Sequence, residues 1–268
     1  MKWADLHSHT PLCKHAVGTA EEYLQAALDK GLAFFGVSDH IPWPRGYDSG
    51  VRMQPEQFGQ YRALVRSIQE KARNTPLTVL YGIELDYVPG RMDEVSSAIG
   101  KEPFDYRIGS VHYVDDFAFD NPDMLHVWEE RGADWVWTRY AGLLCEFIDV
   151  FPFEIMAHPD LPKKFGYVPL DRAPFLEKMK EAFALAASKG IAIEVNTAGL
   201  RKKVHELYPS LELLILAQRA GMPLAFGSDS HTPADVAADF DKALALAKAA
   251  GYRAASAFQD RHLIELPF

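Results

Sequence analysis

The chain has 268 residues, 48% of them hydrophobic, so it is long enough to bury one large core. Its formal net charge of −9 argues against general nucleic-acid binding, which requires a basic surface. No apolar run approaches the roughly 20 residues that cross a bilayer, and the N-terminus lacks the pattern of a secretion signal. Cys13 and Cys145 lie far apart and form no C-x-x-C pair, which favours a reducing compartment. We therefore expect one domain, residues 1–268, in a cytoplasmic protein that binds neither membranes nor nucleic acid.

Strand-like and helix-like patterns alternate along the chain. After a first apolar strand, the segment from Thr19 to Glu22 has the spacing of a capping box and begins a helix. The predicted strands cover residues 2–6, 32–38, 77–83, 106–111, 153–157, 191–195 and 224–227. The predicted helices cover about 19–30, 55–71, 92–99, 135–150, 174–189, 210–220 and 235–250, and segments 41–54 and 115–134 are expected to be long loops. This alternation is typical of an α/β protein with parallel strands.

Each of the seven predicted strands finishes on a polar residue. These residues are His7, Asp39, Glu84, His112, His158, Asn196 and Asp229. In a parallel β/α barrel the carboxyl ends of all strands meet on one face, and active sites are built there. We therefore expect residues hundreds of positions apart to converge. The alternative of scattered surface histidines and acids does not explain why polar residues occur at strand ends and not at strand starts.

The segment after the first strand favours a metal site. His7 and His9 are two residues apart, so they project to the same side, and His15 follows six residues after His9. Neutral imidazole is the commonest metal ligand in proteins. A metal-bound imidazole usually donates its other N–H group to a carboxylate, and Asp5 is a candidate for that acceptor.

Nine side chains are candidate metal ligands: His7, His9, His15, His40, Glu84, His112, His158, Asp229 and His231. Imidazoles mixed with carboxylates suit zinc, iron or manganese. Each ion takes roughly three or four protein ligands plus water, so this set implies two or three divalent ions. Ions about 3.5–4 Å apart typically generate a hydroxide and hold a transferring phosphoryl group, which predicts phosphoester hydrolysis.

The motifs resemble those of the PHP (polymerase and histidinol phosphatase) superfamily, in family order and over nearly the whole chain. The matching segments are Asp5 to His9, Ser38 to His40, Gly82 to Glu84, Ser110 to His112, Ala157 to Pro159 and Gly227 to His231. The resemblance implies an α/β fold, a distorted (β/α)7 barrel of the PHP type, with a trinuclear metal centre. It implies a first ion bound by His7, His9, Glu84 and Asp229, a second by Glu84, His112 and His158, and a third by His15, His40 and His231.

Two longer stretches are similar to the histidinol-phosphate phosphatases within that superfamily. They are Asp5 to Thr19 and Glu194 to Arg201, the second followed by Tyr208 and Pro209. This resemblance implies a phosphomonoesterase that hydrolyses L-histidinol phosphate in histidine biosynthesis. Two alternatives stay open: a PHP phosphoesterase that acts on another small phosphate ester or nucleotide, and a non-catalytic metal- or partner-binding barrel.

Substrate phosphate needs positive charge beyond that of the metals. Arg201 lies just past the sixth strand, where its planar fork could hold two phosphate oxygens, and we predict a catalytic role for it beside Glu84 and Asp229. Lys163, Lys164 and His205 are the other predicted substrate-binding residues, although the lysines could equally be solvated loop charges. Leaving-group protonation stays open between water, Asp160 and a ligand histidine, and the sequence leaves the oligomeric state open.

Overall fold

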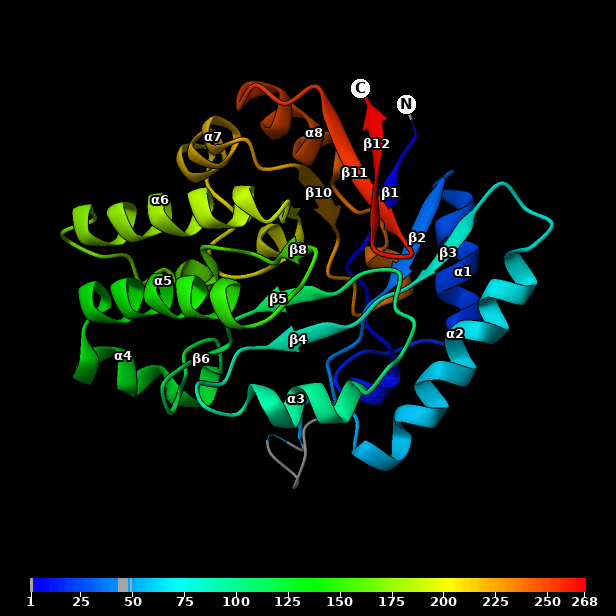
Figure 1. Ribbon diagram of the computed structural model, residues 1–268, viewed down its shortest axis with the longest axis horizontal. Helices are drawn as coiled ribbons and strands as arrows, with labels where there is room; N and C mark the ends of the chain where they lie inside the picture. Colours follow the sequence, from blue (N-terminus) through cyan, green and yellow to red (C-terminus); the bar gives the residue numbers. More distant parts are fainter. Residues whose placement is uncertain (1, 43–47, 49) are drawn as a thin grey trace.

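The computed structural model describes residues 2–42, 48 and 50–268. Its strands lie in the middle of the molecule and helices surround them (Figure 1). The strands are β1 (Ala4–Asp5), β2 (Phe34–Val37), β3 (Thr78–Tyr81), β4 (Glu84–Asp86), β5 (Ile108–Ser110), β6 (Tyr113–Val114), β7 (Phe117–Ala118), β8 (Ile155–Met156), β9 (Ala192–Asn196), β10 (Leu224–Gly227), β11 (Ala254–Gln259) and β12 (His262–Pro267). The helices are α1 (Ala20–Asp29), α2 (Phe58–Ala72), α3 (Met92–Ile99), α4 (Leu125–Arg131), α5 (Ala133–Val150), α6 (Ala173–Ser188), α7 (Leu211–Ala220) and α8 (Phe240–Ala249).

The parallel strands form the predicted distorted (β/α)7 barrel. One sheet has the order β1-β2-β3 and the other the order β10-β9-β8-β5-β4. A backbone hydrogen bond of 3.0 Å from Leu6 to Phe226 joins the β1 side to β10. Two short strands take the place of the third strand of the barrel: β3 pairs with β2, and β4 pairs with β5. This division distorts the barrel and brings Glu84 to the start of a strand.

Several predicted elements are confirmed, and three need correction. The Thr19 side chain caps α1 in a full capping box with Glu22, and α3 and β10 have the predicted bounds. The strand predicted over 77–83 ends at Tyr81, so Glu84 does not follow its end but opens β4. The helix predicted over 235–250 begins only at Phe240, because Ala237 and Asp239 adopt positive φ angles of 50° and 58°.

The third correction concerns the predicted loops. Segment 115–134 contains β7, which pairs with β6, and helix α4, so it is a folded cover and not a long loop. Phe117 and Phe119 are buried in it against Trp128. Of segment 41–54, residues 43–47 and 49 lie outside the described residues, while Arg52 and Met53 are buried.

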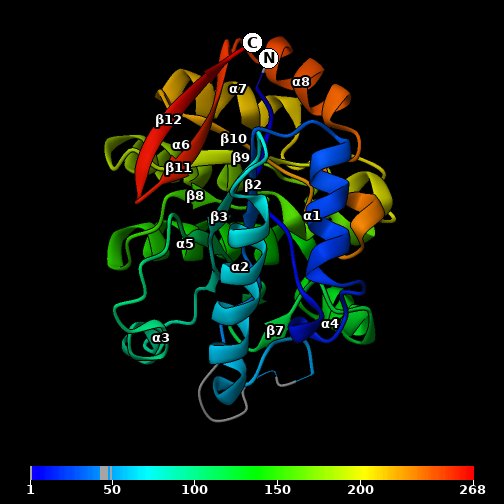
Figure 2. The ribbon, with the colours of Figure 1, turned by 90° about the vertical axis from the view of Figure 1, so that its right-hand side faces the viewer.

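The C-terminal hairpin of β11 and β12, which the sequence pattern did not predict, covers the amino-terminal end of the barrel (Figure 2). Its two turn residues, Asp260 and Arg261, both have positive φ, as a type I′ turn requires. Arg261 donates to Glu154 at 2.6 and 2.8 Å, just before β8, and its backbone N–H bonds Asp105 at 2.8 Å, before β5. The hairpin thus closes the end of the barrel opposite the carboxyl ends of the strands.

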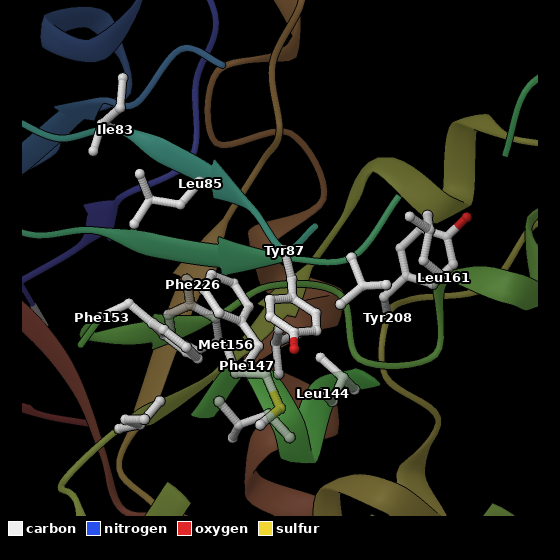
Figure 3. Packing of buried hydrophobic residues seen from close by; sticks show 14 of the residues in the cluster. Ile83, Leu85, Tyr87, Leu144, Phe147, Phe153, Met156, Leu161, Tyr208 and Phe226 are labelled. Atoms are coloured by element: carbon white, nitrogen blue, oxygen red, sulfur yellow. The ribbon is translucent and has the colours of Figure 1, made fainter. Parts of the chain in front are cut away.

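Helices bury the outer faces of the strands. Helices α5 and α6 run side by side along one flank (Figure 1), and fully buried residues such as Leu144 and Phe147 of α5 pack beside Phe153 and Met156 (Figure 3). Each such side chain contributes roughly 1.5–3 kcal/mol by leaving water. Among the helices of the described residues, none combines the length and the apolar character that a bilayer crossing needs.

Candidate metal centre

The structure brings all nine candidate ligands together at the carboxyl ends of the barrel strands. His7 and His9 follow β1, His40 follows β2, Glu84 opens β4, His112 follows β5, His158 follows β8, Asp229 and His231 follow β10, and His15 follows the short 3-10 helix Pro11–Cys13. A cavity of about 480 Å³ opens above them. Seven of the nine line this cavity, while His7 and His9 lie buried beneath it.

Glu84 lies between two groups of imidazoles. Its Oε2 atom faces one group, with His40 Nδ1 at 2.8 Å, His7 Nε2 at 3.5 Å and His9 Nε2 at 3.7 Å. Its Oε1 atom faces the other group, with His158 Nε2 at 3.4 Å and His112 Nε2 at 3.7 Å. A carboxylate whose two oxygens face different sets of nitrogen donors is arranged as a bridge between two cations.

His15 and His231 show a second arrangement that suits a cation. Their Nε2 atoms lie 2.9 Å apart. The Nδ1–H of His15 donates to the Cys13 carbonyl at 2.8 Å, and that of His231 donates to the Asp229 carbonyl at 3.0 Å. These hydrogen bonds assign the neutral tautomer in which each Nε2 carries a lone pair. A cation shared by the two lone pairs would stabilise a contact that is otherwise repulsive.

The donor set fits divalent ions on a further observation. Three of its buried nitrogens make no hydrogen bond to the described residues: His7 Nε2, His9 Nδ1 and His158 Nδ1. Buried polar atoms are normally satisfied, so each such group in a cluster indicates a missing partner. Imidazole nitrogens with carboxylate oxygens are ligands that zinc, iron and manganese accept.

Two carboxylates that the sequence analysis did not select orient the imidazoles. Glu194 Oε1 accepts from His7 Nδ1 at 2.7 Å, and Asp86 Oδ1 accepts from His112 Nδ1. Glu194, and not Asp5, is therefore the acceptor for His7. Asp5 instead accepts from Ser228, through its N–H at 2.8 Å and its hydroxyl at 2.6 Å, and so fixes the turn after β10.

Both missed residues left a signal in the sequence. Asp86 is two residues after Glu84, so on one strand the two carboxylates share a face, as His7 and His9 do. Glu194 is an acid inside an otherwise apolar strand. A Cβ atom at Gly227 would lie only 2.0 Å from Glu194 Oε1, so glycine is needed there for Glu194 to reach His7.

The buried carboxylates and imidazoles shift one another's pKa values strongly. Burial opposes the charge of Glu84, but His40 and His7 outweigh it and hold the pKa of Glu84 well below its usual range. Burial likewise opposes protonation of His9 and His112, yet Asp229 and Asp39 raise the pKa of His9 to about 9. Asp86 and Glu84 raise the pKa of His112 to about 9 in the same way.

We expect zinc binding to the metal-free protein to release protons at about pH 7.5, because only neutral imidazole ligates a metal. His9 and His112 have a raised pKa of about 9, so both are protonated at this pH. The protonated forms of His9 and His112 stabilise the metal-free fold. This contribution to the free energy of unfolding is complete below pH 6.5, the usual histidine pKa, and is lost as pH rises through about 9. Titration with zinc chloride in a weakly buffered indicator solution measures the release, which should shrink towards pH 10. Binding without any proton release would contradict these protonation states.

Arg52 connects the cavity wall to the metal ligands. Its side chain is 2% exposed and lines the cavity. Its guanidinium donates to Asp86 Oδ2 at 2.5 Å and to Asp48 Oδ2 at 3.1 Å. Asp86 therefore holds Arg52 with one oxygen and His112 with the other. Burial opposes the charge of Asp86, but Arg52 and His112 outweigh it and hold its pKa well below the usual range.

Asp86→Asn is expected to weaken metal affinity or turnover by roughly 10- to 100-fold, the usual effect of losing a carboxylate that orients a metal-ligating histidine. The carboxylate of Asp86 accepts from His112 with one oxygen and from Arg52 with the other, whereas the asparagine amide has one neutral oxygen. The His112 ring therefore loses its fixed orientation. Metal titration and steady-state kinetics measure the effect. Asp149→Asn, on the exposed end of α5, is the control and should change neither. Equal metal affinity and equal turnover in Asp86→Asn and the parent protein would exclude this role.

The predicted substrate-binding residues are placed differently from one another. Lys164 lines the cavity, where its ammonium group contacts the Asp120 carbonyl at 2.9 Å and carboxylate at 3.1 Å. Lys163 is buried away from the cavity wall, and Leu207 O, Asp160 Oδ2 and Glu206 Oε2 surround its ammonium group at 2.7–3.1 Å. This placement occupies all three donors of Lys163 and does not support a phosphate contact.

Arg201 and His205 lie outside the cavity lining. The Arg201 guanidinium donates to the Ser228 carbonyl at 2.6 Å and lies 3.3 Å from Asp235, so it holds the backbone beside Asp229. His205 is exposed and contacts the Leu200 carbonyl at 3.2 Å. A direct phosphate contact by either residue stays a prediction.

Comparison with known proteins gives a consistent family. The PHP domain model matches residues 5–198. A protein of Deinococcus radiodurans described as "Probable histidinol-phosphatase" is 40% identical over 240 residues, which are 90% of each chain. The "Histidinol-phosphatase" of Bacillus subtilis is 26% identical and covers 88% of this chain and 96% of its own.

A solved structure extends this likeness to the fold. The histidinol phosphate phosphatase of Lactococcus lactis subsp. lactis, complexed with zinc, L-histidinol and phosphate, superposes with a TM-score of 0.79. It is 21% identical and covers 98% of this chain and 99% of its own. With a family model that spans most of the barrel and a relative 40% identical over 90% of the chain, this chain belongs to the PHP family.

Proposed function

We propose that this chain is a metal-dependent phosphomonoesterase that hydrolyses L-histidinol phosphate to L-histidinol and phosphate, a step of histidine biosynthesis. The observation that carries the proposal is the position of Glu84 between two imidazole groups at the base of the cavity. The relatives from Deinococcus radiodurans and Bacillus subtilis, both named for this phosphatase activity, support the choice of substrate.

The proposed ligand sets are those that the resemblance to the PHP superfamily implies, and the proximity of His7, His9 and Asp229 to one another supports the first set. His7, His9, Glu84 and Asp229 would hold one ion, and Glu84, His112 and His158 a second. His15, His40 and His231 would hold a third. Bound divalent ions supply an activated water and neutralise charge on a phosphoryl group. The zinc in the Lactococcus lactis relative supports zinc as one of these ions, with iron or manganese as alternatives.

The protein's own groups would bind and orient the ester. The cavity wall carries cations, Arg52 and Lys164, together with acids such as Asp48 and Asp120. Histidinol phosphate bears an ammonium group as well as a phosphate, so a wall of both signs suits it better than a purely basic wall. Lys164 is our candidate for a phosphate contact, and Arg201 is our candidate for keeping Asp229 in place. We also propose that residues 1–268 form one barrel domain, in a cytoplasmic protein.

A substrate panel tests this proposal. The protein, loaded in turn with zinc, manganese or iron, is given L-histidinol phosphate, adenosine monophosphate or 4-nitrophenyl phosphate, and phosphate release is measured. We expect kcat/KM for histidinol phosphate to exceed that for the other esters by at least about 100-fold, since a site built around polar substrate groups rejects esters that lack them. Selective turnover of the nucleotide would favour another PHP phosphoesterase. Turnover of none of the three would favour a non-catalytic barrel.

A further inference from the structure

Tyr208 lies on the cavity wall with a hydroxyl group that the protein does not use. Tyr208 is 1% exposed and lines the cavity, as His158 and Leu161 do, and Figure 3 places it beside Leu161. Its backbone is fixed, because it exchanges two hydrogen bonds of 2.6 and 3.0 Å with Asn196 at the end of β9. The hydroxyl is buried and has no hydrogen-bond partner among the described residues.

Other buried tyrosines of the barrel have their hydroxyl groups satisfied. Tyr61 donates to carbonyls of Val37 and Gly82, Tyr106 to Leu6, and Tyr140 to His158. Within the described part of the chain, three tyrosines have a buried hydroxyl without a partner: Tyr23, Tyr208 and Tyr252. Of these three, Tyr208 alone lines the cavity. Since an unmade hydrogen bond is costly in a buried site, a ligand in the cavity is the natural partner for this hydroxyl.

The Tyr208 ring is held in place by its neighbours. The Lys163 ammonium lies 5.4 Å from the centre of the ring, and the His158 imidazole meets it edge-on at 6.4 Å. Lys164 is another residue that lines the cavity. The ring also packs on Gly199, where a Cβ atom would come within 2.9 Å of the ring carbon Cε2, so it cannot swing away without moving the backbone. The hydroxyl is therefore a fixed donor on the cavity wall, beside the candidate metal ligand His158.

We propose that the Tyr208 hydroxyl donates a hydrogen bond to a phosphoryl oxygen of the substrate and is a substrate-binding residue of this site. The inference rests on the proposed phosphomonoesterase function, but it applies to any phosphate ester that the site accepts. A phenol is a suitable donor here because it gives a directional hydrogen bond without adding charge beside the metal ligands.

Tyr208→Phe tests the proposal, because it removes the hydroxyl and keeps the ring. We expect kcat/KM for histidinol phosphate and for 4-nitrophenyl phosphate to fall by roughly 10- to 100-fold, the effect of losing a hydrogen bond to a charged group. Competitive inhibition by inorganic phosphate should weaken by a similar factor. The midpoint of thermal unfolding should stay constant or rise, because no hydrogen bond within the protein is lost.

Tyr252→Phe is the matched control. It removes another buried hydroxyl without a partner in the described residues, but one outside the cavity lining, so its kinetics and phosphate inhibition should equal those of the parent protein. Unchanged kcat/KM and unchanged phosphate inhibition in Tyr208→Phe would overturn the proposal. A loss of activity together with a clear fall in the unfolding midpoint would also overturn it, in favour of a purely structural role. If the parent protein ignores histidinol phosphate but hydrolyses 4-nitrophenyl phosphate, the substrate assignment fails while Tyr208 is still tested on the second ester.

Discussion

Glu84→Gln is expected to lower kcat/KM by at least roughly 10³-fold, because the stabilisation by metal ions is worth several kcal/mol in phosphoryl transfer. An amide has a single acceptor oxygen, whereas Glu84 presents one oxygen to His7, His9 and His40 and the other to His112 and His158. The substitution keeps the volume of the side chain and can keep the hydrogen bond from the Ser110 hydroxyl, which is 2.6 Å long.

The comparison needs a folded variant and a matched control. Far-ultraviolet circular dichroism should show the same helix content in Glu84→Gln and the parent protein. Glu265→Gln on the exposed face of β12 makes the same chemical change far from the cavity, and should retain full activity. If Glu84→Gln turned over histidinol phosphate at a rate comparable to that of Glu265→Gln, Glu84 would not bridge the ions.

Removal of the metal ions is expected to cause the second large loss of activity. Dialysis against a chelator should reduce hydrolysis to below about 1% of its starting value, because without cations the buried imidazoles and carboxylates cannot activate water. Zinc or manganese added back should restore the activity. The restored ions should also raise the unfolding midpoint, since a ligand at 100 times its Kd stabilises the folded state by about 2.7 kcal/mol. For a chain of this size that corresponds to roughly 5–10 °C.

Magnesium chloride at the same concentration serves as the control for ionic strength, because this ion prefers oxygen ligands and should not replace zinc at an imidazole-rich centre. Full activity after exhaustive chelation, with no response of the unfolding midpoint to zinc, would mean that the histidine cluster serves another purpose.

Most of the fold and the set of metal ligands could be predicted from patterns among neighbouring residues in the sequence. The alternation of apolar strands with amphipathic helices is a local pattern, and so are the polar residues that follow strands, such as His7, His112 and His158. Their convergence follows from the parallel barrel, which requires no knowledge of individual contacts. The capping box of Thr19 and Glu22 was readable for the same reason, since both partners lie within one turn.

The features that the sequence did not predict depend mostly on contacts between residues far apart in the chain. Arg201 had a suitable position at the end of a strand, but its guanidinium is bound to Ser228 and Asp235, which only the folded chain brings to it. Arg52 occupies the cavity wall because Asp86 pairs with it, and no local pattern marks that pair. The C-terminal hairpin turns at Asp260 and Arg261, which adopt positive φ without the glycine or asparagine that normally signals such a turn.

The most direct test is the metal content of the purified protein, measured by elemental analysis after loading with zinc and removal of free ions. Six of the seven strand positions of the barrel bring nine imidazole and carboxylate ligands around one cavity. This arrangement predicts two or three tightly bound ions per chain, and fewer in Glu84→Gln. Less than one ion per chain in the parent protein, or the same number in both proteins, would contradict a polynuclear centre bridged by Glu84.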